Sequence, residues 1–236
     1  MRQEGGSVRL RETRVHRYAI NFVRYANMKK ISRKPGEHVK HVFIAIYGIN
    51  NIGKSWHAKR LVERLKAAGK KAIYIKYPAY EMEPSGSVLN TMLRKNKVQN
   101  VSEEELQLWY TLNRFQHAPI LKKLLEEHDY VVTEDYTGTG ICWGYTKGAN
   151  LEWLEKINAP LIPADLSVLM TGERKKASAE KEHLHESNEE LLTKAEKNFL
   201  ILADRYHWKS VLKDEDYEIT NQRFWDILVA ADSTLR

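Results

Sequence analysis

Short apolar runs alternate with amphipathic stretches from about residue 41 to the end of the chain. Runs with the length of a buried parallel strand occupy residues 41–47, 72–77, 130–133 and 166–170, and a weaker run lies at 210–212. Between the first two runs, apolar residues recur with helical spacing over residues 55–68, and we expect this helix to end before Gly69. Strands that alternate with helices predict an α/β fold, in which helices cover both faces of a parallel sheet.

Local helix signals predict how the segments between the strands fold. Ser102 and Glu105 form the pattern of a capping box, so we expect a helix to begin there and to run to about His117. Pro119 suits the first turn of a helix, and we expect it to begin a second helix that ends near His128. Further helical stretches are expected at 87–94, within 137–157, at 189–205 and at 221–231.

The net charge of +7 is concentrated at the start of the chain. Residues 1–40 contain 11 Lys and Arg and three acidic residues, which leaves 27 basic and 28 acidic residues in 41–236. We therefore expect a basic N-terminal extension followed by one domain, with no nucleic-acid-binding face on that domain. The extension can be interpreted as a disordered tail, as sequence upstream of a true start at Met28, or as a targeting or nucleic-acid-binding arm.

The composition excludes several classes of protein. A single cysteine, Cys142, excludes an intrachain disulfide and a cysteine-based zinc site. No apolar run approaches the roughly 20 residues that a membrane-spanning helix needs, and the N-terminus lacks the apolar stretch of a secretory signal. We therefore expect a cytoplasmic protein that does not associate with a membrane.

Residues 48–55 (GINNIGKS) match the phosphate-binding pattern G-x-x-x-x-G-K-[ST], with a predicted strand before them and a predicted helix after them. Backbone N–H groups of such a loop and the helix N-terminus attract the phosphates of ATP, and glycine allows the backbone to approach them closely. Lys54 would reach the β and γ phosphates, and Ser55 would bind Mg²⁺. The predicted contacts to ATP come from Gly48, Asn50, Asn51, Ile52, Gly53, Lys54, Ser55 and Trp56.

An acidic pair, Glu134 and Asp135, follows the third apolar run directly. One of these carboxylates could bind Mg²⁺ or act as a base on an acceptor hydroxyl. We predict catalytic roles for Lys54, Glu134 and Asp135, with Ser55 and Glu134 as metal ligands. The alternative is an acidic strand end that faces solvent.

From Phe43 to about Trp208 the sequence resembles the thymidylate kinase family, P-loop enzymes that phosphorylate dTMP with ATP. The P-loop is followed by Lys76-Tyr77-Pro78, by residues 108–116 (LWYTLNRFQ) and 131–136 (VVTEDY), and by a charged segment, 173–188, in the place of a mobile lid. The resemblance implies a three-layer P-loop NTPase domain over residues 41–236, a small-molecule nucleotide substrate and a homodimer.

The resemblance also implies how a pyrimidine nucleotide would be bound. Tyr110 would stack on the base, and Arg114 would hydrogen-bond a base carbonyl. Aromatic stacking with one polar group to identify the ring suits a pyrimidine. The implied substrate-binding residues are Tyr77, Tyr80, Tyr110, Arg114 and Trp143.

The chain departs from the family pattern where the acceptor phosphate would bind. Tyr80 and Asp135 stand at the positions of two phosphate-binding arginines, and Asn50 and Asn51 replace an acid and an arginine in the P-loop. A carboxylate repels a phosphate dianion, and a lost guanidinium forfeits about 1.5–3 kcal/mol of charge-assisted bonding. Lid closure could bring in a substitute cation. The candidates are Lys147, Arg174, Lys175, Lys176 and Lys181.

Three functions are compatible with these features. The first is a nucleoside monophosphate kinase that converts dTMP to dTDP by direct in-line phosphoryl transfer. The second is a deoxynucleoside kinase in which Glu134 is the base for the sugar hydroxyl, and the third is a catalytically weak ATP-binding protein of the same fold. The retained segment around Tyr110 and Arg114 and the order of the motifs favour the first two, and the lost arginines favour the second and third. We adopt the first as the prediction.

Overall fold

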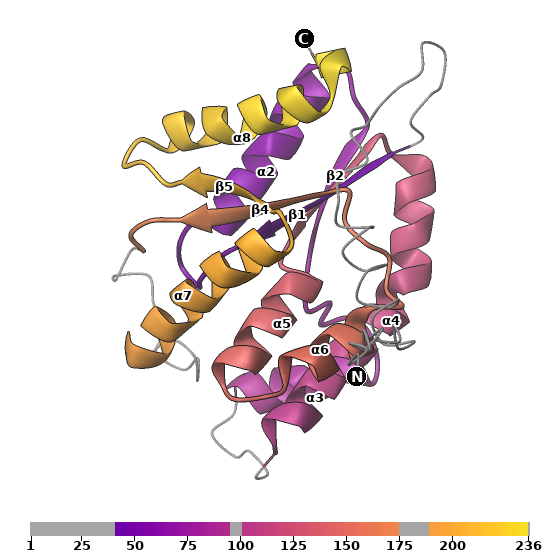
Figure 1. The fold of residues 1–236 in the computed structure, drawn as a ribbon. Coiled ribbons are helices and arrows are strands. Elements are labelled where there is room, and N and C mark those ends of the chain that lie inside the picture. Colours follow the sequence, from indigo (N-terminus) through magenta and orange to yellow (C-terminus); the bar gives the residue numbers. More distant parts are fainter. Residues whose placement is uncertain (1–40, 95–100, 175–188, 236) are drawn as a thin grey trace, which may run out of the picture.

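A five-stranded parallel sheet forms the centre of the protein (Figure 1). The computed structural model describes residues 41–94, 101–174 and 189–235. The strands are β1 (Val42–Tyr47), β2 (Ala72–Lys76), β3 (Tyr130–Glu134), β4 (Leu166–Thr171) and β5 (Lys209–Leu212), in the order β2-β3-β1-β4-β5. Every pairing between neighbours is parallel, which confirms the predicted sheet.

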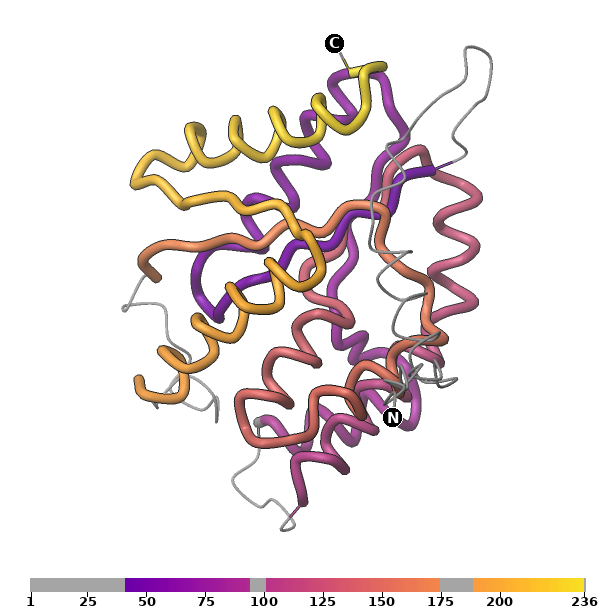
Figure 2. Tube along the Cα trace, viewed as in Figure 1, coloured from indigo at the N-terminus to yellow at the C-terminus, as the bar shows by residue number. Residues whose placement is uncertain are grey.

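Helices cover both faces of the sheet and give the predicted three layers (Figure 1, Figure 2). One outer layer consists of α2 (Lys54–Ala67) and α8 (Tyr217–Ala231), which pack against each other. The other layer contains α4 (Glu103–Glu127), α5 (Thr137–Thr146) and α7 (Glu189–Arg205). Two shorter helices, α3 (Ser85–Arg94) and α6 (Leu151–Asn158), pack on α4, and a 3-10 turn, η2 (Ser233–Leu235), follows α8.

One long helix, α4, replaces the two helices expected between 102 and 128. Its start follows the prediction, because the Ser102 hydroxyl oxygen accepts the backbone N–H of Glu105 at 3.2 Å. Pro119 lies inside α4 and does not begin a new helix, so that prediction was wrong. Proline removes one backbone hydrogen bond, but the helix continues because Leu121 and Leu125 beyond it are buried in the core.

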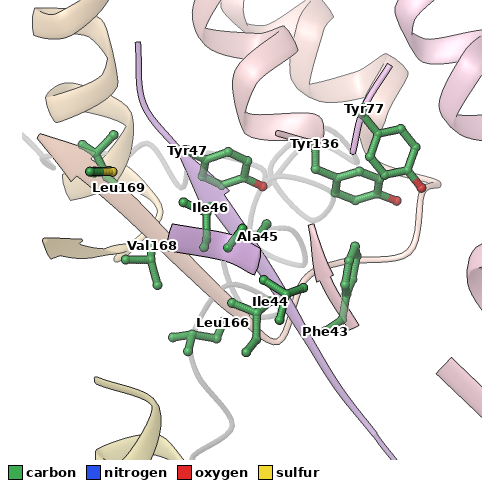
Figure 3. Packing of buried hydrophobic residues seen from close by; sticks show 14 of the residues in the cluster. Phe43, Ile44, Ala45, Ile46, Tyr47, Tyr77, Tyr136, Leu166, Val168 and Leu169 are labelled. Carbon is green, nitrogen blue, oxygen red and sulfur yellow. The ribbon is translucent and has the colours of Figure 1, made fainter. Parts of the chain in front are cut away.

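The hydrophobic core gathers around β1, whose six residues are all buried. Aromatic rings extend this core toward the ends of the strands. The ring of Tyr136 lies 5.2 Å from that of Phe43 and 4.9 Å from that of Tyr77, measured between centroids (Figure 3). Tyr77 and Tyr136 follow β2 and β3 closely, so core packing fixes the chain just beyond both strands.

Some predicted segments lie outside the described ranges. These are the N-terminal extension, 1–40, and the part of the expected lid that contains Lys175, Lys176 and Lys181. Among the described residues, no helix combines the length and the apolar character needed to cross a bilayer.

Candidate active site

Three strand ends meet at one edge of the sheet. Glu134, the last residue of β3, lies in register with Ile46 of β1 on one side and with Lys76 of β2 on the other. The P-loop follows β1, and Asp135 follows β3. The crevice beyond the carboxyl ends of parallel strands is the usual ligand site of such a sheet. The fold therefore brings the predicted P-loop and the predicted acidic pair to one place.

The P-loop backbone adopts conformations that its glycines allow. Gly48 has φ 143°, and a Cβ there would lie 2.6 Å from the carbonyl oxygen of Met170. Gly53 has φ 112° and is the N-cap of α2, whose first turn contains no acidic side chain. No side chain caps α2, so its first N–H groups and its dipole are directed at any anion in the loop.

Lys54 is buried beneath the loop that it follows. Its Nζ donates to the carbonyl oxygens of Gly48 and Ile49, at 2.9 Å each. The same atom lies 3.7 Å from Oδ1 of Asp135. The ammonium group is thus fixed between the P-loop and the end of β3.

Glu134 is held as a carboxylate. The Tyr74 hydroxyl donates to its Oε2 at 2.6 Å, and Nζ of Lys76 lies 3.1 Å from its Oε1. Burial acts to raise the pKa of Glu134, but the charges of Lys54 and Lys76 and hydrogen bonds from Ser55 and Tyr74 outweigh it and lower that pKa. An ionised carboxylate next to the Ser55 hydroxyl supplies the hard oxygen donors that Mg²⁺ prefers.

Asp135 is less easily ionised than its neighbour. Burial raises the pKa of Asp135 and the charge of Glu134 adds to this, although Lys54 and the hydroxyl of Thr139 oppose them. Oγ1 of Thr139, in the first turn of α5, donates to Oδ1 of Asp135 at 2.7 Å. The backbone of Asp135 is left-handed, with φ 61°. This side chain is therefore fixed by both its own backbone and α5.

A cleft of about 690 Å³ opens beside these groups, a volume that suits a nucleotide-sized ligand. It is lined by all the predicted substrate-binding residues, Tyr77, Tyr80, Tyr110, Arg114 and Trp143. It is also lined by Asn50, Asn51, Gly53, Lys54, Ser55, Trp56, Glu134 and Asp135, which were predicted to bind ATP or metal or to act in catalysis. Gly48 and Ile52 do not line the cleft, because both are buried behind the loop.

Arg114 places a charge at the base of the aromatic part of the cleft. Its side chain is buried, and Nη1 donates to Oδ1 of Asn158 at 3.0 Å. Its Nε has no hydrogen-bond partner among the described residues. A Cβ on Gly140 would lie 2.5 Å from Nη2, so α5 rests directly on the guanidinium group. A buried guanidinium with an unused donor suits a carbonyl group of a ligand.

Gln107 and Glu103 also line the cleft and were not predicted from the sequence. Nε2 of Gln107 donates to Oε1 of Glu103 at 2.7 Å, and Oε1 of Gln107 is buried without a partner among the described residues. Gln107 precedes Tyr110 by three residues and Arg114 by seven, a spacing that places all three on one face of α4. That spacing could have revealed Gln107.

Three further residues of the site were missed, namely Tyr74, Lys76 and Tyr217. Tyr74 and Lys76 bind Glu134 from the neighbouring strand, while Tyr217 lines the cleft and packs edge-on against Trp56 at 5.0 Å. These contacts depend on strand register and on the packing of α8 against α2. Neither is visible in the local sequence pattern.

The family comparison agrees with this geometry, because a model described as Thymidylate kinase matches residues 46–223. The chain belongs to the thymidylate kinase family. Membership confirms the predicted family. Human thymidylate kinase is 27% identical over 128 residues, which cover 54% of this chain and 59% of the human protein. Putative thymidylate kinase 251L of Invertebrate iridescent virus 6 is 23% identical over 189 residues, 79% of this chain and 87% of the viral protein.

Solved thymidylate kinase structures share the fold. The enzyme from Candida albicans superposes with a TM-score of 0.69 at 19% identity and covers 84% of this chain and 94% of its own. The enzyme from Ehrlichia chaffeensis gives a TM-score of 0.62 at 15% identity, and the match covers 80% of this chain and 98% of that enzyme. The predicted P-loop fold is confirmed.

The resemblance led us to expect that other cations replace two arginines at the acceptor side of the cleft. Two of these cations form ion pairs with acidic side chains. Nζ of Lys147 lies 3.1 Å from Oε2 of Glu103, and Nη2 of Arg174 lies 3.1 Å from Oε1 of Glu189. Neither Lys147 nor Arg174 lines the cleft formed by the described residues.

Proposed function

We propose that this protein transfers the γ-phosphoryl group of ATP to a deoxynucleoside monophosphate, with dTMP as the acceptor and dTDP as the product. The observation that carries the proposal is a single cleft lined by both the P-loop lysine, Lys54, and the buried Arg114. The first group suits a phosphoryl donor, and the second suits the base of an acceptor. The family match and the names of the relatives support the same reaction.

The P-loop would hold the phosphates of ATP. Lys54 uses two of its three N–H donors on the carbonyls of Gly48 and Ile49, which leaves one for a phosphate oxygen. Because these bonds fix the ammonium group in advance, it can neutralise the charge that develops during transfer with little reorganisation. Catalysis would then rest mainly on positioning and charge.

Ser55 and Glu134 fit the role of Mg²⁺ ligands. The Ser55 hydroxyl bonds to the Glu134 side chain, whose lowered pKa keeps it ionised. When bound, Mg²⁺ would neutralise charge on the phosphate oxygens and help to align the γ-phosphoryl group with the acceptor.

Tyr110 and Arg114 would recognise the acceptor base. The guanidinium carbon of Arg114 lies 6.0 Å from the centre of the Tyr110 ring. A pyrimidine stacked on that ring would bring a carbonyl close to the guanidinium group of Arg114. Tyr77 supports this wall of the cleft, because its hydroxyl and Nδ1 of His117 are hydrogen-bonded at 2.8 Å.

A deoxynucleoside kinase is the second candidate, and the carboxylate of Asp135 at an arginine position favours it. In that reaction Glu134 would take the proton from the sugar hydroxyl. The lowered pKa of Glu134 and its bonds to Tyr74 and Lys76 make it a weak base. The monophosphate kinase is therefore the better supported of the two.

An ADP-release assay with ATP and Mg²⁺ distinguishes these functions. The acceptors are thymidine, dTMP, dUMP, dCMP and dGMP. Turnover with dTMP and not with thymidine is the expected result. Turnover with thymidine alone would show that the protein is a nucleoside kinase. ATP binding without turnover would favour the catalytically weak ATP-binding protein.

We also propose that two copies of the chain associate through α4. Leu108, Leu112 and Phe115 are exposed and follow helical spacing, so they form one apolar face that a second copy could cover. Sedimentation should give twice the chain mass of 27.5 kDa, and Leu112→Glu should halve it. A wild-type protein that sediments as a monomer would reject this association. The cytoplasmic location expected from the sequence stays a prediction.

A further inference from the structure

The acceptor phosphate, whose presence rests on the function proposed above, needs a cation close to it. The family positions for that cation hold Tyr80 and Asp135. Two carboxylates, Glu134 and Asp135, end β3 beside the cleft. Unless positive charge lies next to these carboxylates, they would repel a phosphate dianion.

The basic side chains that line the cleft, among the described residues, are Lys54, Lys76 and Arg114. Lys54 donates hydrogen bonds to the P-loop carbonyls, and in the proposed function it binds the phosphates of the donor. Arg114 is buried beneath α5 and bonded to Asn158, so it serves the base and not the phosphate. Lys76 is the remaining basic residue, because binding of the donor and of the base does not use it.

Lys76 stands at the acceptor side of the strand ends. It is the last residue of β2 and lies in register with Glu134 on β3, one strand farther from the P-loop than Glu134 itself. Its side chain is 50% exposed, and its Nζ lies 3.1 Å from Oε1 of Glu134. Tyr80, at one of the missing arginine positions, lines the same cleft.

We propose that Lys76 binds the phosphate of the acceptor nucleotide and replaces the family's arginines in that role. A lysine ammonium group has three donors on a flexible stem, so Nζ can keep its contact with Glu134 and still donate to a phosphate oxygen. A half-exposed group can make this adjustment without disturbing the core.

The charges near the strand ends support this role. Glu134 and Asp135 are faced by two ammonium groups, since Lys54 lies 3.7 Å from Asp135 and Lys76 lies 3.1 Å from Glu134. The carboxylates are therefore compensated before a ligand enters. Removing Lys76 would leave Glu134 without its partner on the acceptor side, where the phosphate would meet an uncompensated carboxylate.

Calorimetric titration with dTMP and with thymidine, in the absence of ATP, tests the proposal, because the two ligands differ only in the phosphate. Lys76→Gln should weaken dTMP binding about 10–100-fold and change thymidine binding less than twofold. Lys76→Arg should keep most of the affinity for dTMP. Lys71→Gln is the matched control, since Lys71 is an exposed lysine directly before the other end of β2. This variant should bind both ligands as the wild type does.

Two results would overturn the role of Lys76. One is a Lys76→Gln variant that binds dTMP within twofold of the wild type. The other is a variant that loses dTMP and thymidine equally, because a phosphate contact cannot affect a ligand without a phosphate. The salt dependence gives a second measure, since dTMP affinity should fall with ionic strength more steeply in the wild type than in Lys76→Gln.

Failure of this role and failure of the proposed function give different results. If wild-type protein releases no ADP with dTMP, the function itself is wrong, and the role of Lys76 is rejected with it. If the wild type turns over dTMP while Lys76→Gln binds dTMP normally, the function stands and only the role of Lys76 is lost.

Discussion

Nζ of Lys54 lies 3.7 Å from Oδ1 of Asp135, across the gap between the P-loop and the end of β3. Lys54 is buried, and Oδ1 of Asp135 also accepts a hydrogen bond from Oγ1 of Thr139. The contact joins the predicted phosphate-binding lysine to one carboxylate of the predicted acidic pair. Both partners give predictions that can be measured.

Asp135→Asn should increase the free energy of unfolding at neutral pH. Burial raises the pKa of Asp135, so the folded state carries an unfavourable ionised carboxylate above that pKa. Asparagine removes the charge, tolerates the left-handed backbone and can still accept from Thr139. Urea unfolding at pH 7 should show the gain, and the gain should shrink as the pH falls toward the ordinary aspartate pKa. The exposed Asp204→Asn is the control, and a less stable Asp135→Asn variant would contradict the prediction.

Lys54→Ala should reduce kcat by about 10²–10³-fold or more, because the variant loses a positioned charge at the transferred group. The measurement is ADP release at saturating ATP and dTMP, with circular dichroism to verify that the variant folds. Lys66→Ala, an exposed lysine farther along α2, should turn over normally. Retained activity in Lys54→Ala would remove the P-loop assignment.

Gly140→Ala should raise the KM for dTMP by about 10-fold and leave the KM for ATP unchanged. The new methyl group would lie 2.5 Å from Nη2 of Arg114, so the guanidinium must move away from the position in which it would meet the base. Tyr145→Ala, at an exposed residue of the same helix outside the cleft lining, serves as the control. Equal changes in both KM values would show that α5 acts on the whole site and not through Arg114.

Tyr110→Ala should raise the KM for the acceptor far more than the KM for ATP. Stacking of a base on an aromatic side chain contributes about 1–3 kcal/mol, which corresponds to roughly 5–150-fold in the KM for dTMP. Steady-state kinetics with each substrate varied in turn gives both KM values. Lys122→Ala, at an exposed position farther along the same helix and outside the cleft lining, should leave both unchanged. A variant in which both KM values rise together would place Tyr110 outside the base pocket.

His57 should make the protein less stable in mild acid. Its ring is buried between Tyr217 and Phe224, and burial, with the charge of Lys213, lowers its pKa to about 4. Between about pH 6.5 and 4, His57 is therefore protonated in the unfolded chain and neutral in the folded chain. The free energy of unfolding decreases as the pH is lowered through this range, by up to about 3 kcal/mol.

His57→Phe keeps the aromatic packing and should remove this part of the pH dependence. The check is urea unfolding of the wild type and the variant from pH 7 to pH 4. His207→Asn is the control, because His207 is exposed and its φ of 54° suits asparagine. Parallel curves for the wild type and His57→Phe would contradict the prediction.

Much of the fold could be predicted because local patterns decide it. Helix α7 (Glu189–Arg205) has the predicted ends, and Ser102 caps α4 as its motif indicated. The prediction failed at Pro119, where buried leucines beyond the proline keep one helix continuous. A local rule for proline does not include the packing that decides such a case.

The site was predicted as far as its chemistry lies in contiguous motifs. The P-loop and the α4 residues Tyr110 and Arg114 line the same cleft. Lys76 was missed, because its contact with Glu134 depends on how β2 pairs with β3. Gln107 was missed because glutamine on a helix has no characteristic motif, although its spacing from Arg114 was available.

The end of β3 lies between two lysines, Lys54 of the P-loop and Lys76 of β2. If the proposed function holds, a change at Glu134 or Asp135 should therefore affect the binding of donor and acceptor together. Gln107 of α4 is hydrogen-bonded to Glu103 of the same helix and not to the P-loop, and we expect changes at Gln107 and Tyr110 to act mainly on the acceptor. For an engineer who wants a kinase with a new acceptor, this divides the cleft into a fixed part and an adjustable part. A library should randomise the inner face of α4 and leave the strand end untouched.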